Sequence, residues 1–143
     1  SAAVPAGLRP ILCIGETLDE RQSGSTSEVI KRQLSAVISQ TEAEAFEQAV
    51  IAYEPVWAIG TGITADTSQI EEAHQIIRDF IMNKDEKLAT EIRILYGGSV
   101  KPGNAAELIG IEGVDGFLVG GASLSVDSFM EITQGISDHY DKG

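Results

Sequence analysis

The amino-acid sequence predicts an α/β fold built from four strand–helix units. Short apolar runs recur at 10–14, 50–53, 92–96 and 116–119, and segments with apolar residues at helical spacing follow them. Each run ends in a loop that bears glycine or glutamate. Buried strands that alternate with helices form a parallel sheet with right-handed crossovers. An open four-stranded sheet and half of an eight-stranded barrel both fit this pattern.

The first unit begins with the strand Pro10-Ile11-Leu12-Cys13-Ile14, and Gly15-Glu16-Thr17 turns away from its end. Serine and threonine at 23–26 are candidates for the N-cap of the next helix. That helix is predicted from the apolar face formed by Val29, Ile30, Gln33, Leu34, Val37 and Ile38. Because Cys13 lies in an apolar run, we expect a small core residue rather than a reactive thiol.

The second unit carries the most distinctive stretch of the chain. Its strand, 50–53, ends on Glu54, and Pro55 restricts that glutamate to extended backbone. Residues 56–59 are apolar, and Gly60-Thr61-Gly62 supplies flexible backbone after them. A carboxylate at a strand end followed by such a loop indicates a candidate catalytic group beneath a lid.

The remaining helices are predicted from capping patterns and apolar stripes. The helix of the second unit begins near Asp66 and reaches Ile81, before polar residues at 83–87, with two candidate capping boxes: Asp66 with Gln69, or Ser68 with Glu71. Asn104 has capping-box spacing to Glu107, and predicts a short helix through Ile109. A last helix is predicted from Phe129, Ile132 and Ile136.

The composition is that of a globular domain with an acidic charge balance. Of 143 residues, 43% are hydrophobic and 22% are charged, and the formal net charge is −12. This charge repels nucleic acid and anionic membrane surfaces, so we expect neither as a partner. A single cysteine allows no intrachain disulfide, and neither a signal peptide nor a membrane span is recognisable, which favours the cytoplasm.

Two further strand ends carry glycine pairs, in Gly97-Gly98-Ser99 and in Gly120-Gly121-Ala122-Ser123. Glycine lets the backbone approach an anion closely, and the amides at the start of the following helix direct their donors at it. The alternative explanation for each pair is a tight turn packed beneath a helix. His74 and His139 lie away from the strand ends, so we expect neither to be catalytic.

Four motifs together resemble the triosephosphate isomerase family: Pro10-Ile11-Leu12-Cys13-Ile14-Gly15-Glu16-Thr17, Ala52 through Gly62, Leu95 through Val100, and Phe117 through Leu124. The run Tyr-Glu-Pro-Val-Trp-Ala-Ile-Gly-Thr-Gly is highly specific for that family. The resemblance extends from about Ala6 to near the carboxyl end and covers only the second half of the family's (β/α)8 barrel. It implies a single half-barrel domain over residues 1–143, with four βα units in 8–143 and a remnant of a preceding helix or leader in 1–7.

The resemblance also implies roles for individual residues. Glu54 looks like the base that moves a proton between adjacent carbons of dihydroxyacetone phosphate and glyceraldehyde 3-phosphate through an enediolate. The residues that would bind the substrate phosphate are Gly60, Ser99, Gly120 and Gly121. The lid would comprise Pro55, Val56, Trp57, Ala58, Ile59, Gly60, Thr61, Gly62 and Ile63, with Glu16, Tyr96 and Ala65 as its supports. The resemblance implies neither a metal nor a cofactor.

Several groups of the family's site are missing from this sequence. The lysine, asparagine and histidine that polarise the substrate belong to the first half of the barrel, and Ile63 replaces a lysine common at the lid's second hinge. We expect an isomerase of glycolysis and gluconeogenesis that is inactive or weakly active alone. The alternatives are a phosphate-binding or self-assembling module without turnover, and a different phosphosugar enzyme. Unpaired edges around Cys13 and Val119 predict association with the missing amino-terminal half or with copies of the chain itself.

Overall fold

The computed structural model describes residues 2–40, 46–59, 61 and 63–141. Within them, a four-stranded sheet has the order β1-β2-β3-β4, and every neighbouring pair is parallel. The strands are β1 (Ile11–Ile14), β2 (Val50–Tyr53), β3 (Ile94–Tyr96) and β4 (Gly116–Phe117). Strands that follow one another in both sequence and space are the arrangement of a (β/α)8 barrel. The predicted α/β class is therefore confirmed, and the sheet is consistent with half of such a barrel.

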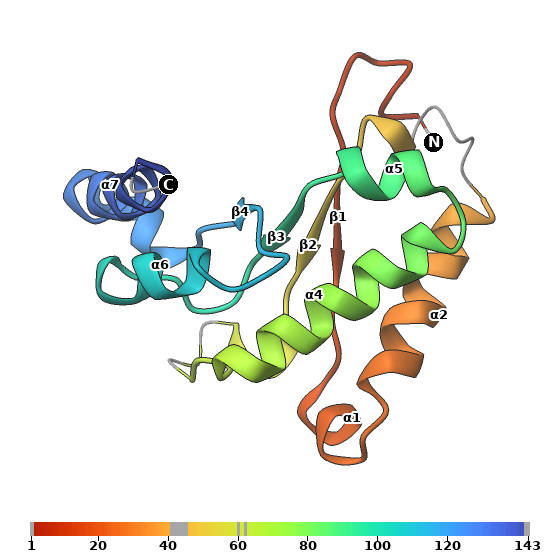
Figure 1. Cartoon of the computed structure of the whole chain (residues 1–143), viewed down its shortest axis with the longest axis horizontal. Helices are drawn as coiled ribbons and strands as arrows, with labels where there is room; N and C mark the ends of the chain where they lie inside the picture. Colours follow the sequence, from red (N-terminus) through yellow and green to blue (C-terminus); the bar gives the residue numbers. More distant parts are fainter. Residues whose placement is uncertain (1, 41–45, 60, 62, 142–143) are drawn as a thin grey trace.

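Helices cover one face of this sheet and extend beyond its β4 edge. Figure 1 shows α2 and α4 side by side across the strands, with α6 and α7 gathered past β4. The helices are α1 (Leu18–Gln22), α2 (Thr26–Ile38), α4 (Thr67–Met82), α5 (Glu86–Glu91), α6 (Pro102–Ile109) and α7 (Val126–Tyr140). Two short 3₁₀ helices, η1 (Val56–Ala58) and η2 (Gly121–Leu124), follow β2 and β4.

The core lies between the sheet and these helices. Ile51 and Tyr53 of β2 and Ile94 and Tyr96 of β3 are fully buried there, together with the apolar stripes of α2 and α4. On β1, in contrast, Ile11 is 49% exposed and Cys13 is also exposed. The prediction that Cys13 belongs to the core is therefore wrong. Side chains alternate between the two faces of a strand, and within the described part of the chain helices cover only one of those faces.

Two helices form where none was predicted. Helix α1 begins with a capping box in which Thr17 accepts a hydrogen bond from the Glu20 amide at 3.3 Å and Glu20 accepts one from the Thr17 amide at 2.9 Å. Helix α5 begins within the polar residues expected at 83–87 and continues to Glu91, and its N-cap Asp85 accepts a hydrogen bond from the Leu88 amide at 3.0 Å. Side-chain caps therefore stabilise both short helices.

The boundaries of other elements differ from those predicted. Strand β3 begins at Ile94 rather than at residue 92 because Ile92 still closes α5. Helix α6 begins at Pro102, which suits a first helical turn, and Asn104 accepts a hydrogen bond from the Lys101 amide instead of forming the cap itself. Of the two candidate capping boxes before α4, the structure has the one formed by Asp66 and Gln69.

Strands β1 and β4 are the two edges of the sheet. Beyond β4, large apolar side chains are exposed on η2 and α7: Leu124, Val126, Phe129 and Met130. Residues 3–7 form turns before β1. No helix in the described part of the chain has the length and apolar character needed to cross a membrane.

Candidate functional site

The loops at the carboxyl ends of the strands are aligned by backbone hydrogen bonds. The Glu54 amide donates to the Ile14 carbonyl at 2.8 Å, and the Gly97 amide donates to the Tyr53 carbonyl at 2.8 Å. The Leu118 amide donates to the Tyr96 carbonyl at 3.0 Å. Each strand thus continues its pairing one residue past the regular sheet, and the three loops that follow lie in a row along one edge.

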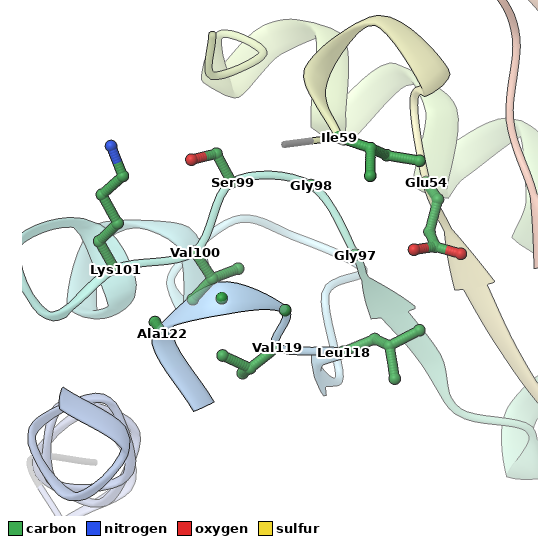
Figure 2. A pocket seen from close by; sticks show the side chains of 12 residues that line it. Glu54, Ile59, Gly97, Gly98, Ser99, Val100, Lys101, Leu118, Val119 and Ala122 are labelled. Atoms are coloured by element: carbon green, nitrogen blue, oxygen red, sulfur yellow. The ribbon is translucent and has the colours of Figure 1, made fainter. Parts of the chain in front are cut away.

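A cavity of about 330 Å³ opens among these loops, and we call it the strand-end cavity. Its lining comes from residues 54, 59, 97–101 and 118–122. Figure 2 shows Glu54 on one side of this cavity and Ser99, Val119 and Ala122 on the other. The structure therefore brings together Glu54, Ser99, Gly120 and Gly121, although they belong to three different strand ends.

Glu54 lies so close to Gly15 and Gly97 that neither position has room for a side chain. A Cβ atom at Gly97 would lie 2.5 Å from Glu54 Cγ, and a Cβ at Gly15 would collide with the Glu54 carbonyl. The side-chain amide of Gln33 holds Gly15 in place, since it accepts from the Gly15 amide and donates to the Gly15 carbonyl, both at 3.0 Å. Two glycines on neighbouring strand ends thus determine where Glu54 can lie.

The charge of Glu54 also acts on Cys13, which neighbours it from β1. Partial burial, followed by the Glu54 carboxylate, raises the pKa of the Cys13 thiol to about 11. Cys13 is therefore a protonated thiol near neutral pH, and it does not line the strand-end cavity with Glu54.

The two glycine pairs differ in what surrounds them. A Cβ at Gly98 would collide with the buried Tyr96 ring and hydroxyl, just as one at Gly97 would meet Glu54. Among the described residues, no atom lies within 4 Å of the position that a Cβ would take at Gly120 or Gly121. Packing within the chain thus accounts for the first pair but not for the second, whose backbone faces the open strand-end cavity.

Hydrogen bonds from small polar side chains hold the loops of this cavity. Asn104 donates to the Ser99 carbonyl at 2.9 Å, and the Ser123 amide and hydroxyl donate to the Gly120 carbonyl at 2.9 and 2.7 Å. Lys101 supplies the one basic side chain among the lining residues. Sequence patterns did not single out this lysine, although its position two residues after Ser99 was a usable signal.

Glu16 lies against Trp57, which follows Glu54 by three residues. The Glu16 carbonyl accepts from the Val56 amide at 3.0 Å, and its carboxylate oxygen Oε1 accepts from Trp57 Nε1 at 3.4 Å. Tyr53 and Arg21 donate to the same oxygen at 3.0 and 2.9 Å. Glu16 is completely buried, and it thereby joins the end of β1 to the segment after β2.

Tyr96 and Ala65 are both buried near the start of α4. Burial raises the pKa of the Tyr96 hydroxyl, and the nearby backbone of Ala65 and Ser99 offsets part of that rise. The hydroxyl has no hydrogen-bond partner of good geometry among the described residues.

The residues predicted as a lid lie partly within the described chain. Val56, Ile59 and Ile63 are all exposed, and of these Ile59 also lines the strand-end cavity. Thr61 stabilises the loop, because its hydroxyl donates to the Trp57 carbonyl at 3.0 Å and accepts from the Ile63 amide at 3.2 Å. Gly60, predicted for both the lid and the phosphate site, and Gly62 lie outside the described residues.

Neither histidine lies at the strand-end cavity. His74 is buried on α4, and its Nδ1 pairs with the Gly113 carbonyl at 2.9 Å. Burial lowers the pKa of His74 to about 4, so the ring is neutral near pH 7. His139 is exposed on α7.

Comparison with known proteins finds similarity along nearly the whole chain. A family model described as triosephosphate isomerase matches residues 1–136. A curated relative from Pseudomonas putida (strain W619), named triosephosphate isomerase, is 56% identical over 132 residues, which are 92% of this chain and 53% of the relative. A relative of the same name from Dechloromonas aromatica (strain RCB) is 56% identical over 127 residues, or 89% of this chain and 51% of the relative. The chain spans about half the length of the curated relatives it matches.

Proposed function

Since the chain belongs to the triosephosphate isomerase family, we propose that it is the carboxyl-terminal half of such an isomerase. In this proposal it interconverts dihydroxyacetone phosphate and glyceraldehyde 3-phosphate when the other half of the barrel is present. Residues 8–143 would supply four βα units, and residues 1–7 would belong to the connection that precedes them. The cytoplasmic location predicted from the single cysteine is part of the same proposal.

The observation that carries the proposal is the strand-end cavity shared by Glu54 and the open glycines Gly120 and Gly121. A carboxylate in this position would take a proton from the carbon beside the substrate carbonyl and return it to the adjacent carbon, through an enediolate. Glycines that no side chain of the described chain crowds leave backbone amides free to approach a phosphate. One cavity would thus hold the proton-transfer base and the phosphate of the same small substrate.

The loop after Glu54 would act as the lid of this site. We propose that Pro55 to Ile63 closes over the substrate, with Glu16, Tyr96 and Ala65 as its supports and Gly60 and Ser99 on the phosphate. Closure would exclude water from the base and protect the enediolate from loss of phosphate, an effect for which this family is a standard example.

Among the described residues that line the strand-end cavity there is no histidine or asparagine, and its lysine, Lys101, lies on the side of Ser99 and not beside Glu54 (Figure 2). Neither His74 nor His139 lines the strand-end cavity. In other enzymes, removing a single hydrogen-bond donor that stabilises developing charge raises the activation free energy by about 3 kcal/mol. The chain alone should therefore be a weak catalyst or none, and the donors should come from the amino-terminal half of the barrel.

The edges of the sheet provide the surface for that half. Ile11 and Cys13 are exposed on β1, and Leu124, Val126, Phe129 and Met130 are exposed on the β4 side. Unpaired edges next to exposed apolar side chains favour association with further strands. We propose the family's amino-terminal four βα units as the partner, and copies of the chain itself as the alternative.

The function is tested by mixing the two halves. The 143-residue chain is assayed for triose phosphate interconversion alone and after addition of the amino-terminal half of a family member, with Glu54→Gln as the matched control. We expect activity only in the mixture, and a loss of about 10³-fold for Glu54→Gln, in line with the contribution of a general base. An inactive mixture that still binds phosphate would favour a binding module without turnover. Appreciable activity of the lone chain would contradict the argument from the missing donors.

Association is tested separately by light scattering across a range of chain concentrations. We expect a mass that grows with concentration, and a fall in the binding of a hydrophobic dye when the amino-terminal half is added. A monomer that is independent of concentration and binds no dye would refute this part of the proposal.

A further inference from the structure

The guanidinium of Arg21, on α1, links Glu16, which contacts the beginning of the loop after Glu54, to helix α4 at the end of that loop. Its Nε donates to Glu16 Oε1 at 2.9 Å, and Glu16 in turn contacts Val56 and Trp57 at the beginning of that loop. Its Nη1 donates to Glu72 Oε2 at 2.6 Å and its Nη2 to the Gln69 carbonyl at 3.3 Å, both on α4, which begins at the loop's far end. Sequence patterns did not single out Arg21.

The contact between Glu16 and Trp57 depends on the charge and orientation of Glu16. Oε1 of Glu16 accepts from Arg21, Tyr53 and Trp57, whereas Oε2 is buried without a partner in the described chain. A completely buried carboxyl group loses its hydration, so an opposite charge and hydrogen-bond donors are needed to offset that cost and to hold it in one orientation. Arg21 supplies both, because it reaches Glu16 directly and also donates to the Tyr53 hydroxyl at 3.3 Å, which itself donates to Glu16.

Arg21 is well placed to hold this geometry. Its side chain is 12% exposed, so solvent does little to weaken its pair with Glu16, which has no exposed surface. The planar guanidinium presents several donors in a fixed arrangement, and here it uses them on four acceptors from β2, α4 and the turn after β1. A lysine at this position has no comparable fork.

We propose that Arg21 is a positioning residue, which orients Glu16 against Trp57 and ties that contact to the first turns of α4. The segment Pro55–Ile59 would thereby keep one orientation relative to Glu54. The hydrogen bonds of Arg21 support the orientation of Glu16 and Trp57. The effect of that orientation on catalysis rests on the proposed function.

Trp57 reports on this arrangement directly because it is the only tryptophan in the sequence. The test compares Arg21→Met with the matched control Arg32→Met, which removes the same charge from a pair with Glu20 that is open to solvent: Arg32 is 63% exposed. Two quantities are measured in the full 143-residue chain: the emission maximum of Trp57, and the hydrogen exchange of the Val56 amide.

For Arg21→Met we expect a shift of Trp57 emission to longer wavelength and Val56 exchange that is roughly tenfold faster, the order expected when a hydrogen bond to a charged group is lost. Arg32→Met should change neither quantity. In the active mixture of the two halves, Arg21→Met should lower kcat by roughly 10- to 100-fold with little change in KM, since the base is misplaced while the phosphate contacts remain.

Unchanged emission and unchanged Val56 exchange in a folded Arg21→Met chain would overturn the proposal. If Arg21→Met does not fold, Arg21→Lys decides instead: wild-type emission and exchange in that variant would overturn the proposal, because lysine cannot donate to Glu16, Tyr53 and Glu72 together. An inactive mixture with the wild-type chain would refute the proposed function and leave the two spectroscopic results to decide on Arg21.

Discussion

The glycine pairs Gly97-Gly98 and Gly120-Gly121 look alike in sequence and follow neighbouring strands, yet they differ in their surroundings. Side chains at the first pair would collide with Glu54 and Tyr96, whereas a Cβ at the second would have no atom of the described residues within 4 Å. The first pair is therefore required by contacts within the chain. No contact within the described residues requires glycine at the second pair, and the absence of side chains there leaves room for a ligand in the strand-end cavity.

The contacts that a Cβ would make thus distinguish a glycine required by packing from one that leaves room for a ligand. The distinction predicts opposite outcomes for the same substitution. Alanine at the first pair should disturb the position of Glu54 or the stability of the fold, and alanine at the second should disturb only ligand binding.

Gly97→Ala should have the largest effect. The new methyl group would lie 2.5 Å from Glu54 Cγ, so the flexible Glu54 side chain would move while the fold remains. In the active mixture we expect kcat/KM to fall about 100-fold, as expected when a reacting group is displaced by about 1 Å. The melting temperature should change little, and its collapse would mean that the backbone rather than Glu54 yields.

Cys13 gives a second readout for Gly97→Ala that needs no catalysis. Burial and then the Glu54 carboxylate raise the pKa of the Cys13 thiol to about 11. Displacing Glu54 should lower this pKa, increase the thiolate fraction at a given alkaline pH and speed alkylation of this only cysteine. An identical pH profile of alkylation in both proteins would indicate that Glu54 has not moved.

Gly98→Ala should act on stability instead. Its methyl group would collide with the completely buried Tyr96, which cannot turn away. We expect a loss of about 2 kcal/mol in the free energy of unfolding, measured by urea denaturation, as for overpacking at other core sites. Tyr96→Phe should recover part of that loss in the double variant because it removes the hydroxyl. Wild-type stability of Gly98→Ala would break the contrast between the pairs.

Gly121→Ala should weaken phosphate binding by roughly tenfold, the order of one lost or hindered hydrogen bond to a charged group. No atom of the described residues lies within 4 Å of the new methyl group, so the fold should be as stable as before or slightly more stable. Calorimetric titration of the mixed halves with inorganic phosphate measures the first quantity and thermal unfolding the second. Unchanged phosphate affinity would remove the case for a ligand at this pair.

Gly113→Ala should have the smallest effect. It tests a third reason why a position requires glycine, which is a positive φ angle. Gly113 has a φ angle of 85°, which alanine adopts only with strain, and the new methyl group would lie 3.3 Å from His74 Cβ. We expect a loss of about 1 kcal/mol in the free energy of unfolding, with phosphate binding unchanged. A change in phosphate affinity here would show that stability and binding are not separable in this chain.

The alternation of strands and helices was predictable because buried strands and long amphipathic helices leave periodic apolar patterns. Helices α1 and α5 were not, since five or six residues contain too few positions for a period, and their caps depend on single side chains such as Asp85. Cys13 was placed wrongly because an apolar run does not reveal which face of its strand other elements cover.

The candidate site was predictable in part for similar reasons. Strand-end residues such as Glu54 and Gly120 follow from the rule that parallel strands present their carboxyl ends together. Arg21 was missed because three of its four acceptors, on Tyr53, Gln69 and Glu72, are 32 to 51 residues away in the sequence, and no local pattern links them. Lys101 was missed because it lies just outside the motif that ends at Val100.

The pairing of Gln33 with Gly15 bears on how another strand can join the sheet. The Gln33 side chain imitates a neighbouring peptide group: it engages the amide and the carbonyl of Gly15 at the end of edge strand β1. Gly15 therefore has no amide left to offer an incoming strand. A strand that docks on β1 would form its ladder with residues before Gly15, so a side chain of helix α2 limits how far that ladder can extend.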